Sequence, residues 1–354
     1  MNPAFPLFLS GAADDRRDAF LGAARRLGTR EQNVEKDFWV CWTLDALFNG
    51  AAANGPRLLF KGGTSLSKAF GLISRFSEDI DITIFRDDLG EGADVDALEA
   101  LSGKKRRARL DAIKAASQAY VSGAMRDQLA SQLSDALRAS GLPTTAARIE
   151  QDPDDDDGQS PLIWYPQVTS PADGYVRPAV KIESGAKSAL DPNVSATIRP
   201  YVADDVPDMD LSVANVTTVV AERTFWDKVV ILHGLRQWFE KRGALRASGQ
   251  RVSRHYYDLH RLLDSEAGRR ASHEVNLAAD CVRHARMFFN SPDLNLAMAA
   301  PGSFTLAPNA DMASALARDY AAMVGMIFGQ APAFSDVLKR VAEFEAKVNA
   351  GGRV

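Results

Sequence analysis

The stretch over residues 58–82 constrains the fold of this chain more than any other part of its sequence. An apolar run is followed by the pair Gly62-Gly63, which is typical of a strand that ends in a close turn. Apolar residues then recur at helical spacing, which predicts a helix over residues 64–74. From Asp79 onward polar and apolar residues alternate, which predicts a second strand. The local order is therefore strand, glycine turn, helix and strand.

Two carboxylates on the second strand, opposite the glycine turn, make a place to hold a triphosphate. The alternation puts Asp79 and Asp81 on the same face of the strand. Backbone N–H groups at a turn that opens a helix favour phosphate oxygens, and carboxylates supply the hard oxygen ligands that Mg²⁺ prefers. A Gly-Gly turn or an Asp-x-Asp pair alone is common. Their combination in this order favours a phosphate and metal site over a purely structural turn.

Composition sets the broad class of the protein. The chain has 354 residues, enough for two lobes, and 46% hydrophobic with 25% charged residues exclude a largely disordered chain. A net charge of −4 leaves no overall basic field for nucleic acid, so RNA contact must rest on a local patch. The two cysteines, Cys41 and Cys281, are far apart and lack metal-ligand spacing, which favours a reducing cytoplasm. No segment has the roughly 18 apolar residues of a membrane span.

Two runs of residues resemble one known family. The run from Lys61 to Lys68 (KGGTSLSK) and the run from Arg75 to Asp81 (RFSEDID) resemble the AbiEii/AbiGii-type toxins, a branch of the polymerase β-like nucleotidyltransferase superfamily. The resemblance implies an α/β (α+β) fold. A nucleotidyltransferase lobe with N-terminal helices and a small mixed sheet would cover residues 1–215, and a helical C-terminal lobe residues 216–354. The active-site cleft would lie between the lobes.

The resemblance also implies a function. The expected protein is a Mg²⁺-dependent nucleotidyltransferase toxin of an abortive-infection or type IV toxin–antitoxin-like system. It would transfer NMP from an NTP to RNA, with tRNA as the expected acceptor, use two Mg²⁺ ions, act in the cytoplasm and have a cognate antitoxin encoded nearby. Two alternatives stay open at this point. One is a small-molecule, antibiotic-type nucleotidyltransferase, and the other is a non-catalytic binding module that has kept the fold.

The family pattern assigns roles to particular residues of this sequence. The implied catalytic and metal-binding residues are Asp79, Asp81 and Glu183, and the implied nucleotide-binding residues are Lys61, Gly62, Gly63, Thr64, Ser65 and Lys228. Glu183 ends a predicted strand over residues 175–183, and the other interpretation is a surface strand whose acid faces water. For Lys228 the other interpretation is a solvated lysine beside an Arg223–Asp227 helix pair.

Two charged clusters admit both a functional and a structural interpretation. The basic run consists of Lys104, Lys105, Arg106, Arg107 and Arg109. It could contact an RNA backbone, or it could be the solvated start of a helix. The triplet Glu35-Lys36-Asp37 recurs in the resembled family and has no chemical role that the sequence reveals. We interpret it as a solvated charge cluster at the edge of a packed helix.

Overall fold

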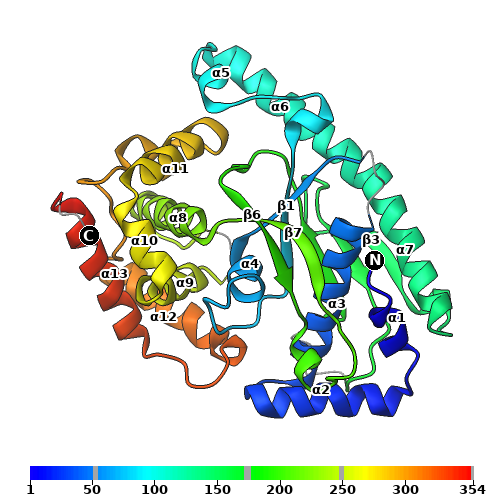
Figure 1. Ribbon diagram of the computed structural model, residues 1–354. Coiled ribbons are helices and arrows are strands. Elements are labelled where there is room, and N and C mark those ends of the chain that lie inside the picture. The colour runs from blue at the N-terminus through cyan, green and yellow to red at the C-terminus, as the bar shows by residue number, and fades with distance from the viewer. Residues whose placement is uncertain (51–54, 171–176, 247–250, 352–354) are drawn as a thin grey trace. The chain divides into compact units, whose positions relative to one another are not determined.

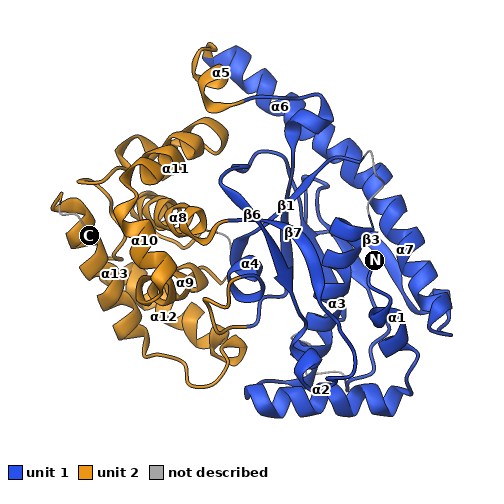
Figure 2. Ribbon diagram, viewed as in Figure 1, with its two compact units in different colours: residues 1–69, 76–93, 103–219 blue, residues 70–75, 94–102, 220–354 orange. Residues whose placement is uncertain are grey.

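The computed structural model describes residues 1–50, 55–170, 177–246 and 251–351 (Figure 1). The chain divides into two compact units, which Figure 2 shows in different colours. Unit 1 consists of residues 1–69, 76–93 and 103–219, and unit 2 of residues 70–75, 94–102 and 220–354. The predicted lobes, 1–215 and 216–354, and the cleft between them stay predictions.

Unit 1 combines helices with all the strands that the structure describes. Its helices and helical turns are α1 (Ala4–Leu9), α2 (Ala13–Leu27), α3 (Glu31–Asn49), α4 (Gly62–Lys68), η1 (Arg86–Leu89), α6 (Gly103–Tyr120), η2 (Val121–Met125), α7 (Arg126–Ala139), η3 (Thr144–Ala146) and η4 (Tyr201–Asp204). Its strands are β1 (Leu58–Lys61), β2 (Asp79–Ile84), β3 (Arg148–Gln151), β4 (Pro161–Trp164), β5 (Ala179–Glu183), β6 (Asn193–Ile198) and β7 (Val213–Val219). The predicted α/β class is confirmed. The predicted strand over residues 175–183 is seen as β5, and residues 175 and 176 lie outside the described residues.

The seven strands form one mixed sheet in the order β3-β4-β5-β2-β1-β7-β6. Strands β1 and β2 are antiparallel, whereas β1 pairs with β7, and β2 with β5, in parallel. The strand that carries Asp79 and Asp81 is therefore central, with β1 on one side and β5 on the other. Ile80 and Ile82 of β2 are buried while Asp79 and Asp81 are half-buried, so burial follows the predicted alternation over residues 79–82. Beyond them Thr83 is buried as well, so the end of the strand is covered on both faces.

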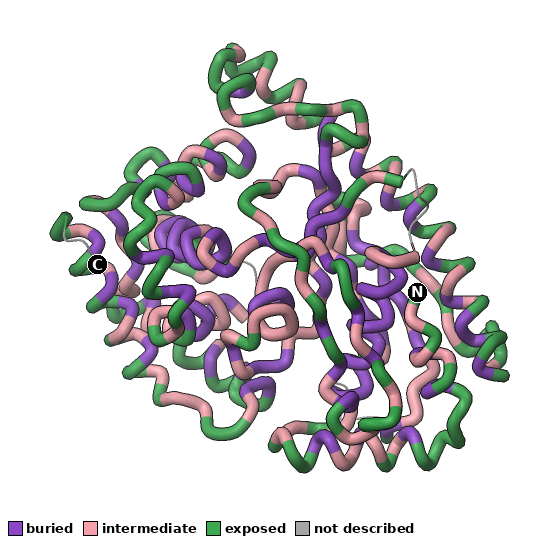
Figure 3. Tube along the Cα trace, viewed as in Figure 1, coloured by how far each residue is buried: buried purple, intermediate pink, exposed green. Residues whose placement is uncertain are grey.

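Helix α3 is the central helix of unit 1. Every residue from Asn33 to Leu47 is buried, because α3 packs against α2 as well as against β2, β5 and β7 (Figure 3). The interpretation of Glu35, Lys36 and Asp37 as a solvated cluster is wrong, since all three side chains are buried. A helix that is covered on all sides leaves its charged residues no path to water, so they must find partners inside the protein.

The helix after the glycine turn is shorter than predicted. Helix α4 ends at Lys68, whereas the spacing of apolar residues predicts a helix to residue 74. Gly71 adopts a φ of +62°, which a continuing right-handed helix does not allow. Ile73 is still buried, so the apolar pattern predicted its burial correctly. The helical conformation that the same pattern predicted for this residue is wrong.

The described regular elements of unit 2 are helices and helical turns, joined by loops and one isolated bridge between Arg75 and Ile327. Its helices and helical turns are α5 (Val95–Glu99), α8 (Ala221–Arg242), α9 (Ser253–Asp264), α10 (Glu266–His273), α11 (Val275–Phe288), η5 (Pro292–Leu294), η6 (Leu296–Met298), α12 (Ala310–Met323), η7 (Val324–Met326) and α13 (Phe334–Asn349). Helix α8 packs against α9, α10 and α11, and its apolar residues form much of the core of this unit (Figure 3). None of the described helices in either unit is both long and apolar enough to cross a bilayer.

Candidate active site

Three neighbouring strands place a row of charged residues across the sheet. Asp81 of β2 is in register with Lys61 of β1 on one side and with Glu183 of β5 on the other. Residues in register on paired strands point to the same face, and Asp79 lies two residues before Asp81 on that face. Glu183 therefore lies on the strand next to the one that carries Asp79 and Asp81. The catalytic and metal-binding roles of the three acids stay predictions.

Lysines accompany these carboxylates. Lys61 Nζ lies 3.6 Å from Asp81 Oδ1, and Lys181 Nζ lies 3.2 Å from Glu183 Oε1. Lys181 also pairs with the buried Asp152 at 3.0 Å. Burial by itself lowers the pKa of Lys181. Its hydrogen bond to Asp152 and the charge of Glu183 raise the pKa by more than burial lowers it, so the net shift is upward. The acids are therefore held in a network that compensates their charge.

The acids fit a divalent cation by their chemistry and accessibility. The side chains of Asp81 and Glu183 are 27% and 41% exposed, so an ion from solvent can reach them. Carboxylate oxygens are the ligands that Mg²⁺ takes in proteins. Among the described residues, however, no group of three or more His, Cys, Asp or Glu is gathered tightly enough to hold a metal as it stands. Binding an ion here would therefore require the carboxylate oxygens to move closer together.

Gly62 brings the turn directly against Asp81. It adopts a φ of +78°, and a β-carbon added to it would lie 2.1 Å from Asp81 Oδ2. Both the backbone conformation and the lack of space explain why glycine stands at this position. The backbone of the turn therefore lies beside the carboxylate, as the sequence pattern of a phosphate and metal site predicts.

The two hydroxyl residues after the glycines tie the turn to itself and to β2. Thr64 Oγ1 donates to the carbonyl oxygen of Asp79 and lies 2.7 Å from Ser77 Oγ. Ser65 Oγ donates to the carbonyl oxygen of Gly62 at 2.9 Å. Thr64 and Ser65 are 1% and 0% exposed, so their hydroxyls are already engaged by the protein. Their contact with phosphate stays a prediction.

Lys228 belongs to a buried charge cluster in unit 2. Its Nζ lies 2.7 Å from Asp258 Oδ2 and 3.5 Å from His255 Nδ1. Arg75 binds the same carboxylate in a bidentate manner, at 2.7 and 2.9 Å. The interpretation of Lys228 as a solvated lysine is wrong, because it is 4% exposed. Its predicted contact with the triphosphate stays a prediction.

Sequence reasoning missed the partners of Asp258. The structure pairs Asp258 with Arg75, which is 183 residues away. Burial alone would raise the pKa of Asp258, but Arg75 and Lys228 lower it well below its usual range. Arg75 stands in the RFSEDID run, so the only sequence signal was its place in that motif.

The basic run lies at the start of α6. Lys104, Lys105 and Arg107 are exposed and Arg106 is half-buried. Arg109 forms an ion pair with Glu91 and donates to the carbonyl oxygen of Gly92 at 2.7 Å. Arg109 is therefore already engaged within unit 1, and its predicted contact with RNA would require this ion pair to open.

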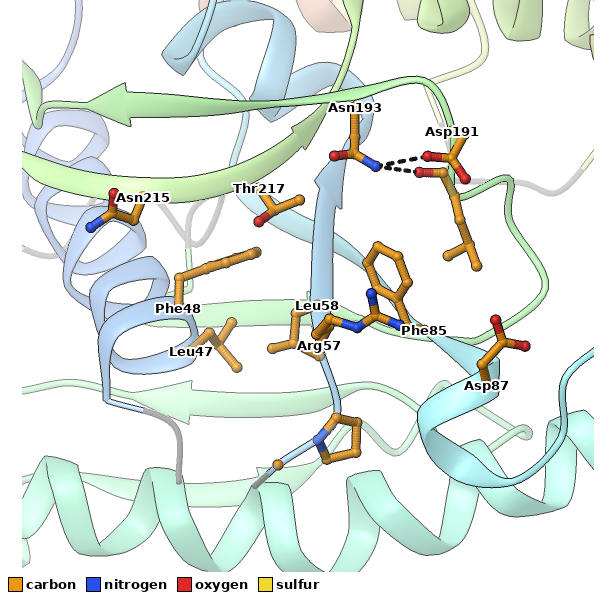
Figure 4. Close-up of a pocket in the computed structure, with 13 residues that line it drawn as sticks. Leu47, Phe48, Arg57, Leu58, Phe85, Asp87, Asp191, Asn193, Asn215 and Thr217 are labelled. Carbon is orange, nitrogen blue, oxygen red and sulfur yellow. Dashed lines mark hydrogen bonds between the residues drawn. The ribbon is translucent and has the colours of Figure 1, made fainter. Parts of the chain in front are cut away.

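One cavity of about 670 Å³ lies within unit 1 but away from the row of charges (Figure 4). Its lining includes Arg57 and Leu58 at the start of β1 and Phe85 just after β2. Because β1 and β2 are antiparallel, these residues lie at the opposite ends of both strands from Lys61 and Asp79. The cavity is therefore separate from the candidate active site.

Comparisons with known proteins agree with the motif. A family model described as "Nucleotidyl transferase AbiEii toxin, Type IV TA system" matches residues 45–349. No curated protein sequence matches the chain significantly. Among solved structures the chain is similar to MenT4, nucleotidyltransferase toxin Rv2826c from Mycobacterium tuberculosis H37Rv, with 15% identity and a TM-score of 0.45, over 93% of this chain and 89% of that chain.

Proposed function

The chain belongs to the AbiEii family of nucleotidyltransferase toxins, of type IV toxin–antitoxin systems, and we propose that it transfers a nucleoside monophosphate from an NTP to RNA, with tRNA as the acceptor. The observation that carries the proposal is the register of Lys61, Asp81 and Glu183 across three strands, beside the Gly62 turn. Family membership sets aside the non-catalytic alternative. A cytoplasmic location and a nearby antitoxin gene remain part of the proposal.

The proposed reaction is an in-line displacement at the α-phosphorus of the NTP. The acceptor hydroxyl forms a bond to this phosphorus, the bond to the bridging oxygen breaks, and pyrophosphate leaves. Glu183 accepts the proton of the attacking hydroxyl, and Lys61, the Gly62-Gly63 turn, Thr64, Ser65 and Lys228 bind phosphate oxygens. Asp79, Asp81 and Glu183 would hold two Mg²⁺ ions, which would supply positive charge to stabilise the attacking and leaving oxygens.

The start of α6 supports RNA as the acceptor. Five cations lie within the first residues of a helix that has no acid in its first turn. The helix dipole disfavours positive charge in the first turn, so Lys104, Lys105 and Arg106 gain no stabilisation from it. Lys104, Lys105 and Arg107 are exposed, and an RNA backbone supplies regularly spaced anions that such a cluster can bind.

The test of the proposed function is Asp81→Asn. This change removes ligand charge at nearly constant volume, so the fold should persist. Transfer should fall by about 1,000-fold or more, because several kcal/mol of transition-state stabilisation are lost. The assay follows an NTP labelled at its α-phosphate into total RNA, and growth of cells that express the protein is scored in parallel.

The matched control is Asp135→Asn, an exposed carboxylate on α7, which should label RNA like the wild type. Wild-type labelling by a folded Asp81→Asn variant would refute the metal role of this acid. Label that enters a small acceptor such as an aminoglycoside, and never RNA, would instead show that the acceptor is wrong and the alternative enzyme right.

A further inference from the structure

Three consecutive charged residues of α3 are buried, and each reaches a different segment of unit 1. Glu35, Lys36 and Asp37 are 1%, 3% and 2% exposed. Glu35 accepts hydrogen bonds from the backbone N–H groups of Val168 and Thr169 at 2.7 and 3.1 Å. The other two residues reach the segment between the glycine turn and the Asp pair: Asp37 contacts Lys68 and Lys36 contacts Glu78.

Lys36 holds the residue that precedes the Asp pair. Its Nζ lies 2.8 Å from Glu78 Oε2, and Glu78 is followed directly by Asp79. The Glu78 side chain is 22% exposed, whereas that of Lys36 is only 4% exposed. The bridge therefore attaches the start of β2 to the central helix of the unit.

Asp37 holds the helix that begins with the glycine turn. Lys68, the last residue of α4, lies 2.9 Å from Asp37 Oδ1, and both side chains are at most 3% exposed. Asp37 Oδ2 also accepts from the backbone N–H of Tyr201 at 2.6 Å, and Lys68 Nζ lies 3.7 Å above the ring of Tyr201. Burial lowers the pKa of Lys68, but Asp37 opposes this and the net shift is upward, so the lysine is charged.

The Lys36–Glu78 and Asp37–Lys68 ion pairs fix the chain before and after a segment that belongs to unit 2. Residues 70–75, which lie between Lys68 and Glu78, belong to unit 2. Helix α3 therefore holds the chain just before it leaves unit 1 and just after it returns. Well-packed apolar residues would stabilise the unit about as well as buried ion pairs do, because desolvation offsets most of the attraction. A buried ion pair differs from apolar packing in that its hydrogen bonds are directional, so it fixes the position of the backbone that carries each partner.

We infer that Lys36 and Asp37 are positioning residues for the transfer reaction. Lys36, through Glu78, sets the position of Asp79 and Asp81, and Asp37, through Lys68, sets the position of the Gly62-Gly63 turn. The inference rests on the proposed function, because it takes these two elements as the metal and phosphate sites. Loss of the Lys36–Glu78 pair should therefore change Mn²⁺ binding and kcat, whereas loss of the Asp37–Lys68 pair should change the KM for the NTP.

The experiment removes both partners of each bridge, so that no buried charge is left unpaired. The first variant is Lys36→Met with Glu78→Gln, and the second is Asp37→Leu with Lys68→Met. The matched control is Glu35→Gln, since Glu35 lies on the same helix with the same burial but holds residues 168 and 169. Each protein is assayed for its urea midpoint, for Mn²⁺ binding by titration calorimetry, and for kcat and KM with the NTP.

The first variant should bind Mn²⁺ about tenfold more weakly and lose about 100-fold in kcat, since a displacement of about 1 Å costs this much. The second should raise the KM for the NTP by about tenfold and leave Mn²⁺ binding unchanged. Glu35→Gln should match the wild type in all three constants, even if its urea midpoint falls. Lys36→Arg, which keeps the bridge, should recover most of the lost kcat.

A merely structural role predicts the opposite pattern. Variants whose urea midpoint falls while Mn²⁺ binding, kcat and KM stay at wild-type values overturn the inference and leave the proposed function intact. A wild-type protein that neither binds Mn²⁺ nor labels any acceptor overturns the proposed function and this inference with it. If the first bridge variant does not fold, Glu78→Gln alone replaces it, because Glu78 is partly exposed and the amide oxygen can still accept a hydrogen bond from Lys36. If the second does not fold, Asp37→Asn alone replaces it, because the amide oxygen keeps an acceptor for the backbone N–H of Tyr201. The same constants are measured for either replacement.

Discussion

Because Gly62 lies so close to Asp81, we predict that Gly62→Ala lowers activity much more than it lowers stability. In Gly62→Ala, the new β-carbon would stand 2.1 Å from Asp81 Oδ2 and 2.7 Å from its Cγ. A carbon–oxygen contact this short is not tolerated, so the carboxylate must move by about 1 Å or rotate out of its place. The carboxylate is the far end of a side chain that can turn, so the fold can relieve the clash at little cost.

Two magnitudes follow from this geometry. An alanine with a φ of +78° costs about 1–2 kcal/mol of folding free energy, because its β-carbon crowds the backbone in the left-handed region. The displaced carboxylate costs far more in activity, about 100-fold in kcat/KM, if Asp81 must lie in register with Glu183 to work. We therefore expect a mildly destabilised protein that is nearly inactive.

Gly90→Ala supplies the matched control. Gly90 has a similar φ of +74° and belongs to the same unit, but a β-carbon there meets nothing within 4 Å. Both variants should show similar shifts of the urea midpoint, and only Gly62→Ala should lose RNA labelling. Equal activity of the two variants, at equal stability, would refute the reasoning that the turn and Asp81 form one site.

The remaining predictions concern unit 2 and the basic run. Asp258→Asn should destabilise the protein by about 3–5 kcal/mol, because it takes the carboxylate away from the buried Arg75 and Lys228. Since the folded-state pKa of Asp258 is lowered, its contribution to stability is full above the ordinary value of about 3.9 and is lost as the pH falls below it. Urea titrations from pH 7 down to acid should therefore show a loss of stability in the wild type that is smaller in Asp258→Asn, and equal slopes would contradict the assignment. Replacing Lys104, Lys105, Arg106 and Arg107 by serine, with Arg109 kept because Glu91 already pairs it, should reduce the salt slope of single-stranded RNA binding by about 3 and leave NTP binding unchanged. An unchanged slope in that variant would place the RNA surface elsewhere.

The candidate site could be predicted where it depends on neighbours in the sequence. The Gly62-Gly63 turn and the alternation from Asp79 to Ile82 follow from local spacing, because strand period and turn chemistry are set within a few residues. The family pattern in the same stretch was enough to assign the enzyme class. The helix after the turn was predicted too long, because an apolar period reports which residues are buried and not whether a helix continues.

The tertiary structure decided which distant residues meet. Glu183 stands beside Asp81 only because β5 pairs with β2 in parallel and in that register, about a hundred residues along the chain. Asp258 takes Arg75 as its partner, and Lys36 takes Glu78, because the packing of whole elements brings them together. Charges that looked like solvated surface in the sequence are buried because α3 is covered on all sides. Sequence sets the local conformation, and long-range packing sets burial and partners, which is why the triplet in α3 showed no role until the sheet around it was known.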